Sequence, residues 1–278
     1  MQIANRDKST QKNSHILILA DFSEGNLAAI HFAMRYLYRP GSVIHLLQTW
    51  QKPNFGSSMV RDLSSMLESI ANNELEGLKL RLKERFALPD DQIRLISFEG
   101  DLSAFFKTET YLSQDWQLVL GTRDNGSLIM NRHRMIELID MVSQDLYVLN
   151  GLKHDNIIRD VFMLADTHMT SQTTLSVLKK IAISENPNLS VCLAPTLVSP
   201  EEKKKRVDLF VENCKGAKLF FNQVEKGEGQ SELSEFAKVE GSKLMVFERN
   251  PKRKLQNGLK SCLDSWLLKS KGIRIGNY

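Results

Sequence analysis

The stretch HILILADFSEGNLAAIHFAMRYLYRPGSVIHLLQTW, residues 15–50, holds one complete unit of the predicted fold. HILILAD (His15–Asp21) is a short apolar run typical of a buried strand. NLAAIHFAMRYLY (Asn26–Tyr38) carries apolar residues at helical spacing, RPG ends that helix, and SVIHLLQTW (Ser42–Trp50) is a second strand. Two strands joined by a helix predict a parallel pair, because a parallel connection must cross back over the sheet.

The rest of the first half continues this alternation. Its further expected strands are residues 92–98, 116–121 and 145–150, and its further expected helices are residues 57–86, 101–113 and 132–143. The order is then β-α-β-α-β-α-β-α-β, and the expected structure is a five-stranded doubly wound sheet with helices on both faces.

The second half repeats the first. LILAD (Leu17–Asp21) and FMLAD (Phe162–Asp166) end on the same dipeptide, and the same alternation follows each of them. The second set of strands is expected at residues 160–166, 188–195, 217–224, 242–248 and 272–277. The fold class is therefore predicted as α/β, with two repeated doubly wound domains, each a five-stranded parallel sheet. A flexible arm is expected at 1–14, domain 1 at 15–150 and domain 2 at 157–278.

Composition excludes several classes of protein. Apolar residues make up 42% and charged residues 25% of the chain, which is typical of a soluble globular protein. Its apolar runs are shorter than the roughly 18 residues that cross a membrane, and its polar N-terminus predicts no secretory signal. The three cysteines show no metal-ligand spacing, so we expect a cytoplasmic protein without a metal. The net charge of +4 is modest, and aromatic residues do not interleave the basic ones, so nucleic acid is not an expected partner.

The turn GTRDNGS (Gly121–Ser127) raises the question of a phosphate site, because it leaves a predicted strand at its carboxyl end. A Walker A loop needs a lysine after its second glycine, and Ser127 and Leu128 follow here instead. The dinucleotide pattern fails too, because Arg123 stands where its middle glycine belongs. Neither phosphate motif is therefore present.

With LILADFSE, five strand–helix elements and a glycine turn after the fourth strand, the chain resembles the universal stress protein family. The repeat resembles a tandem member, a pseudo-dimer with two such domains in one chain. In the nucleotide-binding branch, the resemblance implies G-x-x-G after the fourth strand, then nine residues, then G-[ST]. Gly121 matches the first glycine and Asp21 matches the family's nucleotide-side aspartate.

The motif departs from that pattern after Gly121. Asp124 stands at the second glycine, although Gly126 follows two residues later, and Arg132 and His133 align with G-[ST]. The second half has no glycine directly after its fourth strand, in MVFERNPKRK (Met245–Lys254). A nucleotide, if bound, is therefore expected in domain 1 only. Its pocket residues would be Asp21, Ser23, Gly121, Thr122, Arg123, Asn125, Gly126, Arg132 and His133.

Two main functional interpretations follow from the resemblance, beside a third, a nucleotidase or related enzyme built on the same fold. The first is a non-enzymatic stress-response regulator that acts through protein association, with a lost or modified nucleotide site and no cofactor. The alternative is a binding module that holds ATP or AMP in domain 1. The sequence has no nucleophile elbow of the G-x-S-x-G type, so no catalytic residue is expected. The resemblance also implies pairing of the fifth strands, 145–150 with 272–277, within one chain. An unidentified protein partner and a homodimer complete the expected partners.

Overall fold

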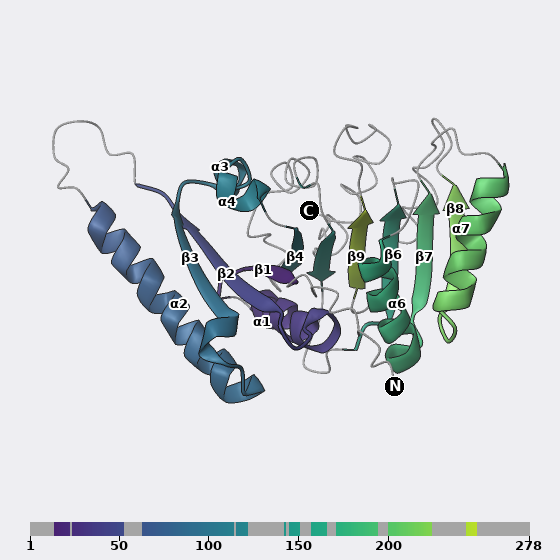
Figure 1. The fold of residues 1–278 in the computed structure, drawn as a ribbon, viewed down its shortest axis with the longest axis horizontal. Helices are drawn as coiled ribbons and strands as arrows, with labels where there is room; N and C mark the ends of the chain where they lie inside the picture. Colours follow the sequence, from purple (N-terminus) through teal and green to yellow (C-terminus); the bar gives the residue numbers. More distant parts are fainter. Residues whose placement is uncertain are drawn as a thin grey trace, which may run out of the picture.

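One mostly parallel β-sheet with helices packed on it forms the fold in the computed structural model of the chain (Figure 1). The structure describes residues 14–22, 24–52, 63–113, 115–121, 142, 145–150, 157–165, 171–193, 200–223 and 243–248. Nine strands lie in the order β3-β2-β1-β4-β5-β9-β6-β7-β8 within this part of the chain. The predicted α/β class is confirmed.

The elements alternate along the chain as the sequence predicts. The first half contains β1 (His15–Leu19), α1 (Glu24–Phe32), the π-helix η1 (Ala33–Leu37), β2 (Val43–Trp50), α2 (Ser64–Phe86), the 3₁₀ turn η2 (Asp90–Gln92), β3 (Ile93–Glu99), α3 (Leu102–Phe105), α4 (Glu109–Leu112), β4 (Trp116–Gly121) and β5 (Leu146–Asn150). The second half contains β6 (Asp160–Ala165), α6 (Gln172–Glu185), β7 (Asn188–Leu193), α7 (Pro200–Asn213), β8 (Lys218–Gln223) and β9 (Lys243–Glu248).

The two halves join through an antiparallel pair of strands. Strands β3, β2, β1, β4 and β5 are parallel to one another, and so are β9, β6, β7 and β8. Between them β5 pairs antiparallel with β9, from Leu146 opposite Phe247 to Asn150 opposite Lys243. The sheet is therefore continuous from one half to the other.

This joint corrects the predicted pairing of 145–150 with 272–277. Both edges of β5 are occupied, by β4 on one side and by β9 on the other, so no third strand can pair there. The halves do meet through the fifth strand of the first half, but its partner is the fourth strand of the second. Residues 272–277, and with them a fifth strand of the second half, lie outside the described residues, as does the arm at 1–13.

One face of the sheet carries a core that both halves share. Alternate strand residues such as Ile16 and Ile44 in the first half, and Val161 and Val191 in the second, belong to one buried cluster. Residues of α1, α2, α6 and α7 complete it, and Figure 1 shows these helices on the same side of the sheet. Burial of this common face holds the two halves together in addition to the strand pairing.

Polar contacts between η1 and α6 reinforce the joint on that face. The Glu185 side chain is only 5% exposed, and its Oε1 lies 2.6 Å from the Arg35 guanidinium. The same carboxylate accepts a hydrogen bond of 2.7 Å from the Tyr36 hydroxyl, and Lys180 donates to the Tyr36 carbonyl. One buried carboxylate of the second half thus binds two side chains of the first.

Two predicted helices differ from the structure. The expected helix at 101–113 is two short helices, α3 and α4, because the Thr108 hydroxyl accepts from the Tyr111 amide and starts a new helix there. The helix expected over 26–38 changes to π geometry at Ala33. The expected helix at 132–143 lies almost wholly outside the described residues.

The opposite face holds a pair of histidines, of which His45 is buried and His15 is half-buried. His15 Nδ1 lies 3.0 Å from His45 Nε2, and both rings pack against Trp116. His45 is 3% exposed, and burial, with smaller effects from His15 and Arg94, lowers its pKa from 6.5 to about 3. His45 is therefore neutral in the folded protein well below neutral pH.

Removing the buried carboxylate at the joint should destabilise the whole chain. Glu185→Ala leaves the Tyr36 hydroxyl and the Arg35 guanidinium without this acceptor, so we expect a loss of about 2 kcal/mol in the free energy of unfolding. Chemical denaturation measures it. The control Glu201→Ala, at an exposed position on α7, should change stability by less than about 0.5 kcal/mol. Equal effects of the two variants would contradict this role for Glu185.

Acid should weaken the fold through His45. Its folded pKa of about 3 lies below the ordinary value of 6.5, so between these pH values the unfolded chain binds a proton that the folded chain does not. The stabilisation is complete above pH 6.5 and falls as the pH drops, by at most about 1.4 kcal/mol per pH unit. Unfolding free energies of the wild type and His45→Gln across this window should converge toward acid. Parallel curves would show that His45 does not titrate in this way.

Candidate functional site

The predicted nucleotide site lies where the strand order reverses. The chain runs from β1 outward to β2 and β3, then returns to β4 on the other side of β1, so β1 and β4 are neighbours. Asp21 follows β1, and Gly121 ends β4, which places both at the carboxyl ends of adjacent strands. Ligands of open α/β sheets bind at this kind of crevice. The sequence therefore located two of its predicted site residues at a suitable rim.

The other predicted site residues lie outside the described part of the chain. They are Ser23, Thr122, Arg123, Asn125, Gly126, Arg132 and His133. Within the described residues, the predicted site can therefore be described only from Asp21, Gly121 and the start of α1.

Gly121 is a glycine because helix α1 packs directly on it. A Cβ atom at this position would lie 1.8 Å from the Gly25 carbonyl oxygen and 2.9 Å from the Asn26 amide nitrogen. These distances are far inside van der Waals contact, so no other residue fits while α1 keeps its place. Gly121 and Gly25 form a contact between the end of β4 and the first turn of α1.

A second contact fixes the start of α1 against β1. The Asn26 side chain is fully buried, and its Nδ2 donates a hydrogen bond of 2.7 Å to the Leu19 carbonyl. Phe22 lies in the chain between Leu19 and Asn26 and is 37% exposed. Its φ of 58° falls in the left-handed region, which non-glycine residues rarely adopt. Phe22, directly after Asp21, is thus held in a strained backbone conformation of the kind that clusters at functional sites.

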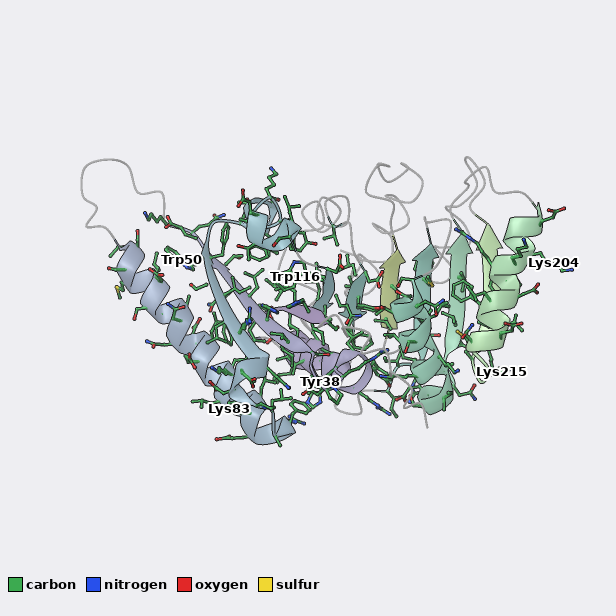
Figure 2. All side chains as sticks on the ribbon, viewed as in Figure 1. Tyr38, Trp50, Lys83, Trp116, Lys204 and Lys215 are labelled. Carbon is green, nitrogen blue, oxygen red and sulfur yellow. The ribbon has the colours of Figure 1, made fainter. Side chains whose placement is uncertain are left out.

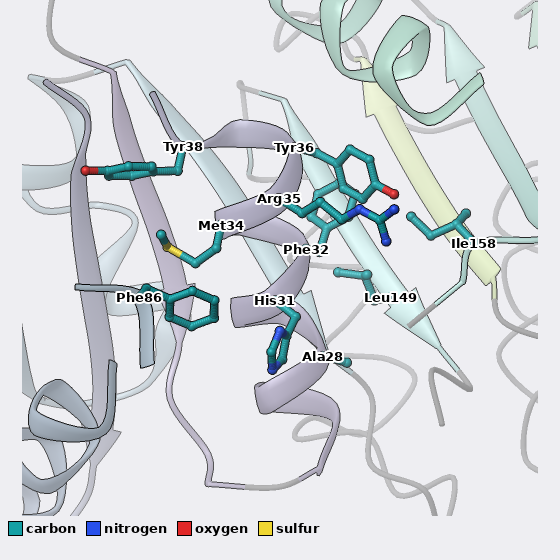
Figure 3. Close-up of a pocket in the computed structure, with 10 residues that line it drawn as sticks. All are labelled: Ala28, His31, Phe32, Met34, Arg35, Tyr36, Tyr38, Phe86, Leu149 and Ile158. Carbon is teal, nitrogen blue, oxygen red and sulfur yellow. The ribbon is translucent and has the colours of Figure 1, made fainter. Parts of the chain in front are cut away.

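A separate pocket of about 470 Å³ lies beside α1 and η1 (Figure 3). Its volume is in the range of small-molecule sites. Its lining residues come from α1, η1, the end of α2, β5 and the segment before β6: Ala28, His31, Phe32, Met34, Arg35, Tyr36, Tyr38, Phe86, Leu149 and Ile158. Nothing in the local sequence pattern indicates this pocket, because four separate stretches of the chain, at 28–38, 86, 149 and 158, form its wall.

Most ionisable side chains that line this pocket are either ion-paired or kept from ionising by burial. Arg35 pairs with Glu185, and burial, followed by repulsion from Arg85, lowers the pKa of His31. The His31 ring packs edge-on against Phe86, with 5.4 Å between the ring centroids. Burial raises the pKa of Tyr36 to about 12, so its hydroxyl stays protonated and donates to Glu185. This wall therefore suits an apolar group better than a polyphosphate.

Within the described ranges, no group of three or more His, Cys, Asp or Glu side chains is placed to hold a metal ion. No helix in that part of the chain is long and apolar enough to cross a membrane.

Comparison with known proteins finds no matching family model and no curated relative. Among solved structures, the chain is similar to a universal stress protein from Archaeoglobus fulgidus DSM 4304, with 12% identity, a TM-score of 0.43, and coverage of 92% of this chain and 91% of that one. It is also similar to a protein described as functionally unknown from Pseudomonas aeruginosa PAO1, with 11% identity, a TM-score of 0.45, and coverage of 94% and 98%. Values this low do not establish a family, so the family and its tandem form stay predictions.

Two glycine substitutions should have opposite effects on stability. Gly121→Ala forces a methyl group into the Gly25 backbone, so we expect a loss of at least about 3 kcal/mol, beyond most single substitutions. Gly77→Ala on α2 meets no atom of its own chain within 4 Å and should stabilise the isolated chain, measured at low protein concentration, by about 0.5–1 kcal/mol, as Ala does over Gly within a helix. Thermal melts of the three proteins measure both effects. A harmless Gly121→Ala would refute the close packing at the rim.

Proposed function

We propose that the protein is a non-enzymatic, cytoplasmic regulator of the tandem universal stress protein type, which acts by associating with another protein. In this proposal the nucleotide site of the first half is lost or modified. The observation that supports a lost or modified site is the contact between Gly121 and Gly25. The absence of a side chain at Gly121 is fully accounted for by the packing of α1, so this glycine does not require a phosphate to explain it.

The same contact makes the rim a poor place for a triphosphate. A phosphate-binding glycine needs open space above its backbone, because the anion must approach the N–H groups closely. Here the space on the side-chain side of Gly121 is filled by the Gly25 carbonyl oxygen, which carries partial negative charge. Asp124, where the family pattern has its second glycine, adds further repulsion.

Nucleotide binding by the first half alone is the second candidate. It is favoured by the location of Asp21 and Gly121 at the ends of neighbouring strands, on either side of the point where the strand order reverses. The strained backbone of Phe22 lies beside the same crevice. ATP or AMP would then contact Asp21, with Arg123 or Arg132 facing the phosphates.

Ligand release and thermal melts separate these two candidates. We expect mass spectrometry to find no nucleotide on the purified protein and melts to show no shift with ATP and magnesium. A bound nucleotide at 100 times its Kd would instead stabilise the fold by about 2.7 kcal/mol.

The rim variant for this test is Asp21→Ala, and its matched control is Asp91→Ala in the exposed turn η2. A nucleotide-dependent shift that Asp21→Ala removes and Asp91→Ala keeps would replace the proposed function with the second candidate. Capture of a specific partner protein that is unchanged by ATP would support association.

A further inference from the structure

Helix α2 is apolar on two opposite faces. Ala71, Leu75, Leu78 and Leu82 are buried and face β2 and β3. This seam repeats at intervals of four and three residues, as expected for a helix lying on a sheet. The inner seam accounts for how α2 is held on its own half.

The outer face of α2 carries a second apolar stripe, centred on Met66, Ile70 and Leu80. These side chains are 60%, 44% and 56% exposed. Together with Asn73, Gly77 and Glu84, they follow the same alternation of four and three residues, on the side of the helix opposite the buried seam. Seen from the side, α2 is the outermost helix of the first half, beyond β3 (Figure 1). A second seam of this spacing predicts a second helix against it.

The charges that flank the stripe show which helix fits. Residues 64–77 contain Glu68, Glu74 and Glu76 and no basic residue, whereas residues 78–86 contain Lys79, Arg81, Lys83 and Arg85 with Glu84 as the single acid. Turned end to end, the acidic part of one α2 faces the basic part of another. The helix is therefore complementary to an antiparallel copy of itself.

We propose that the protein forms a homodimer through antiparallel packing of α2 on α2 of a second copy, around a two-fold axis at the level of Leu78 and Lys79. In this register Leu80 packs on Gly77 of the second copy, where no side chain obstructs it. Ile70 then packs on Ala87 of the second copy. Glu74 pairs with Arg81 of the second copy, and Glu76 pairs with Lys83. A two-fold axis forms each of these contacts twice.

Contacts within one chain already orient part of this surface. Gln48 donates a hydrogen bond of 2.7 Å to Glu74, and Lys83 lies 2.9 Å from Asp90 (Figure 2 labels Lys83). Arg81 Nε lies 3.3 Å from the Gly77 carbonyl, which folds its side chain along the helix. Each of Glu74 and Lys83 keeps further acceptor or donor capacity beside these contacts, so each can also pair with a second copy.

The helix dipole alone would also favour acids early and bases late in α2. It gives no reason, however, for three large apolar side chains on the solvent face, or for a glycine in mid-helix with open space above it. A second copy explains the exposure of Ile70 and Leu80, the glycine and the charges together. This inference does not rest on the state of the nucleotide rim.

Sedimentation velocity across a concentration series, without nucleotide, tests the homodimer. We expect the wild type to dimerise and Leu80→Glu to raise the dissociation constant by at least about tenfold, which is 1.4 kcal/mol. The matched control is Leu112→Glu, at an apolar position on α4 that is 66% exposed, and it should dimerise like the wild type. Circular dichroism verifies that each variant is folded.

A charge exchange tests the antiparallel orientation. Arg81→Glu alone should weaken the dimer, and Glu74→Arg together with Arg81→Glu should restore it, because the two positions face each other in this arrangement. A wild type that stays monomeric would overturn the proposal, as would a dimer that Leu80→Glu leaves intact. A monomer that instead loses a different protein partner through Leu80→Glu would assign the stripe to that partner.

Discussion

The antiparallel pairing of β5 with β9 determines the rest of the architecture. Each strand is the edge of a parallel set, and an unpaired edge exposes backbone groups that invite aggregation. Pairing them satisfies those groups and relates the halves by an approximate two-fold rotation. Such a rotation keeps α1 and α6 on the same face of the sheet, and there Glu185 lies within reach of Arg35 and Tyr36. The shared core, the buried carboxylate and the pocket beside η1 all follow from this one joint.

Local features of the fold were predictable from the sequence, and the joint was not. The strand at 116–121 and the helix ending at 86 are visible because periodicity reports which side of each element is buried. The partner of β5 depends on which edge of the second half is nearest in space, and 242–248 and 272–277 both fit the pattern of a short strand. The split of 101–113 was missed because Thr108 caps a new helix with a single hydroxyl, a signal that periodicity alone does not weigh.

For the candidate site, the sequence predicted where Asp21 and Gly121 lie in the sheet, but not why position 121 is a glycine. The predicted strand order placed Asp21 and Gly121 at the carboxyl ends of neighbouring strands, as the structure has them; that a ligand binds there stays a prediction. The reason for the glycine came from Gly25, almost a hundred positions away, and no local pattern connects the two. The pocket beside η1 was missed for the same reason, since its wall comes from four separate stretches of the chain. The seven other predicted site residues stay predictions.

Gly121 and Gly77 show why a glycine cannot be interpreted from its neighbours in sequence alone. At Gly121 the space of the missing side chain is filled by backbone of the same chain, and the glycine allows α1 to pack on β4. At Gly77 the space is empty, although a glycine within a helix weakens it relative to alanine. This loss of helix stability is offset only when another group packs into the open space at Gly77. In one half of this protein, therefore, the glycine at the expected ligand rim is satisfied internally, whereas the glycine on the solvent face of α2 marks the place where another backbone or a large side chain can approach.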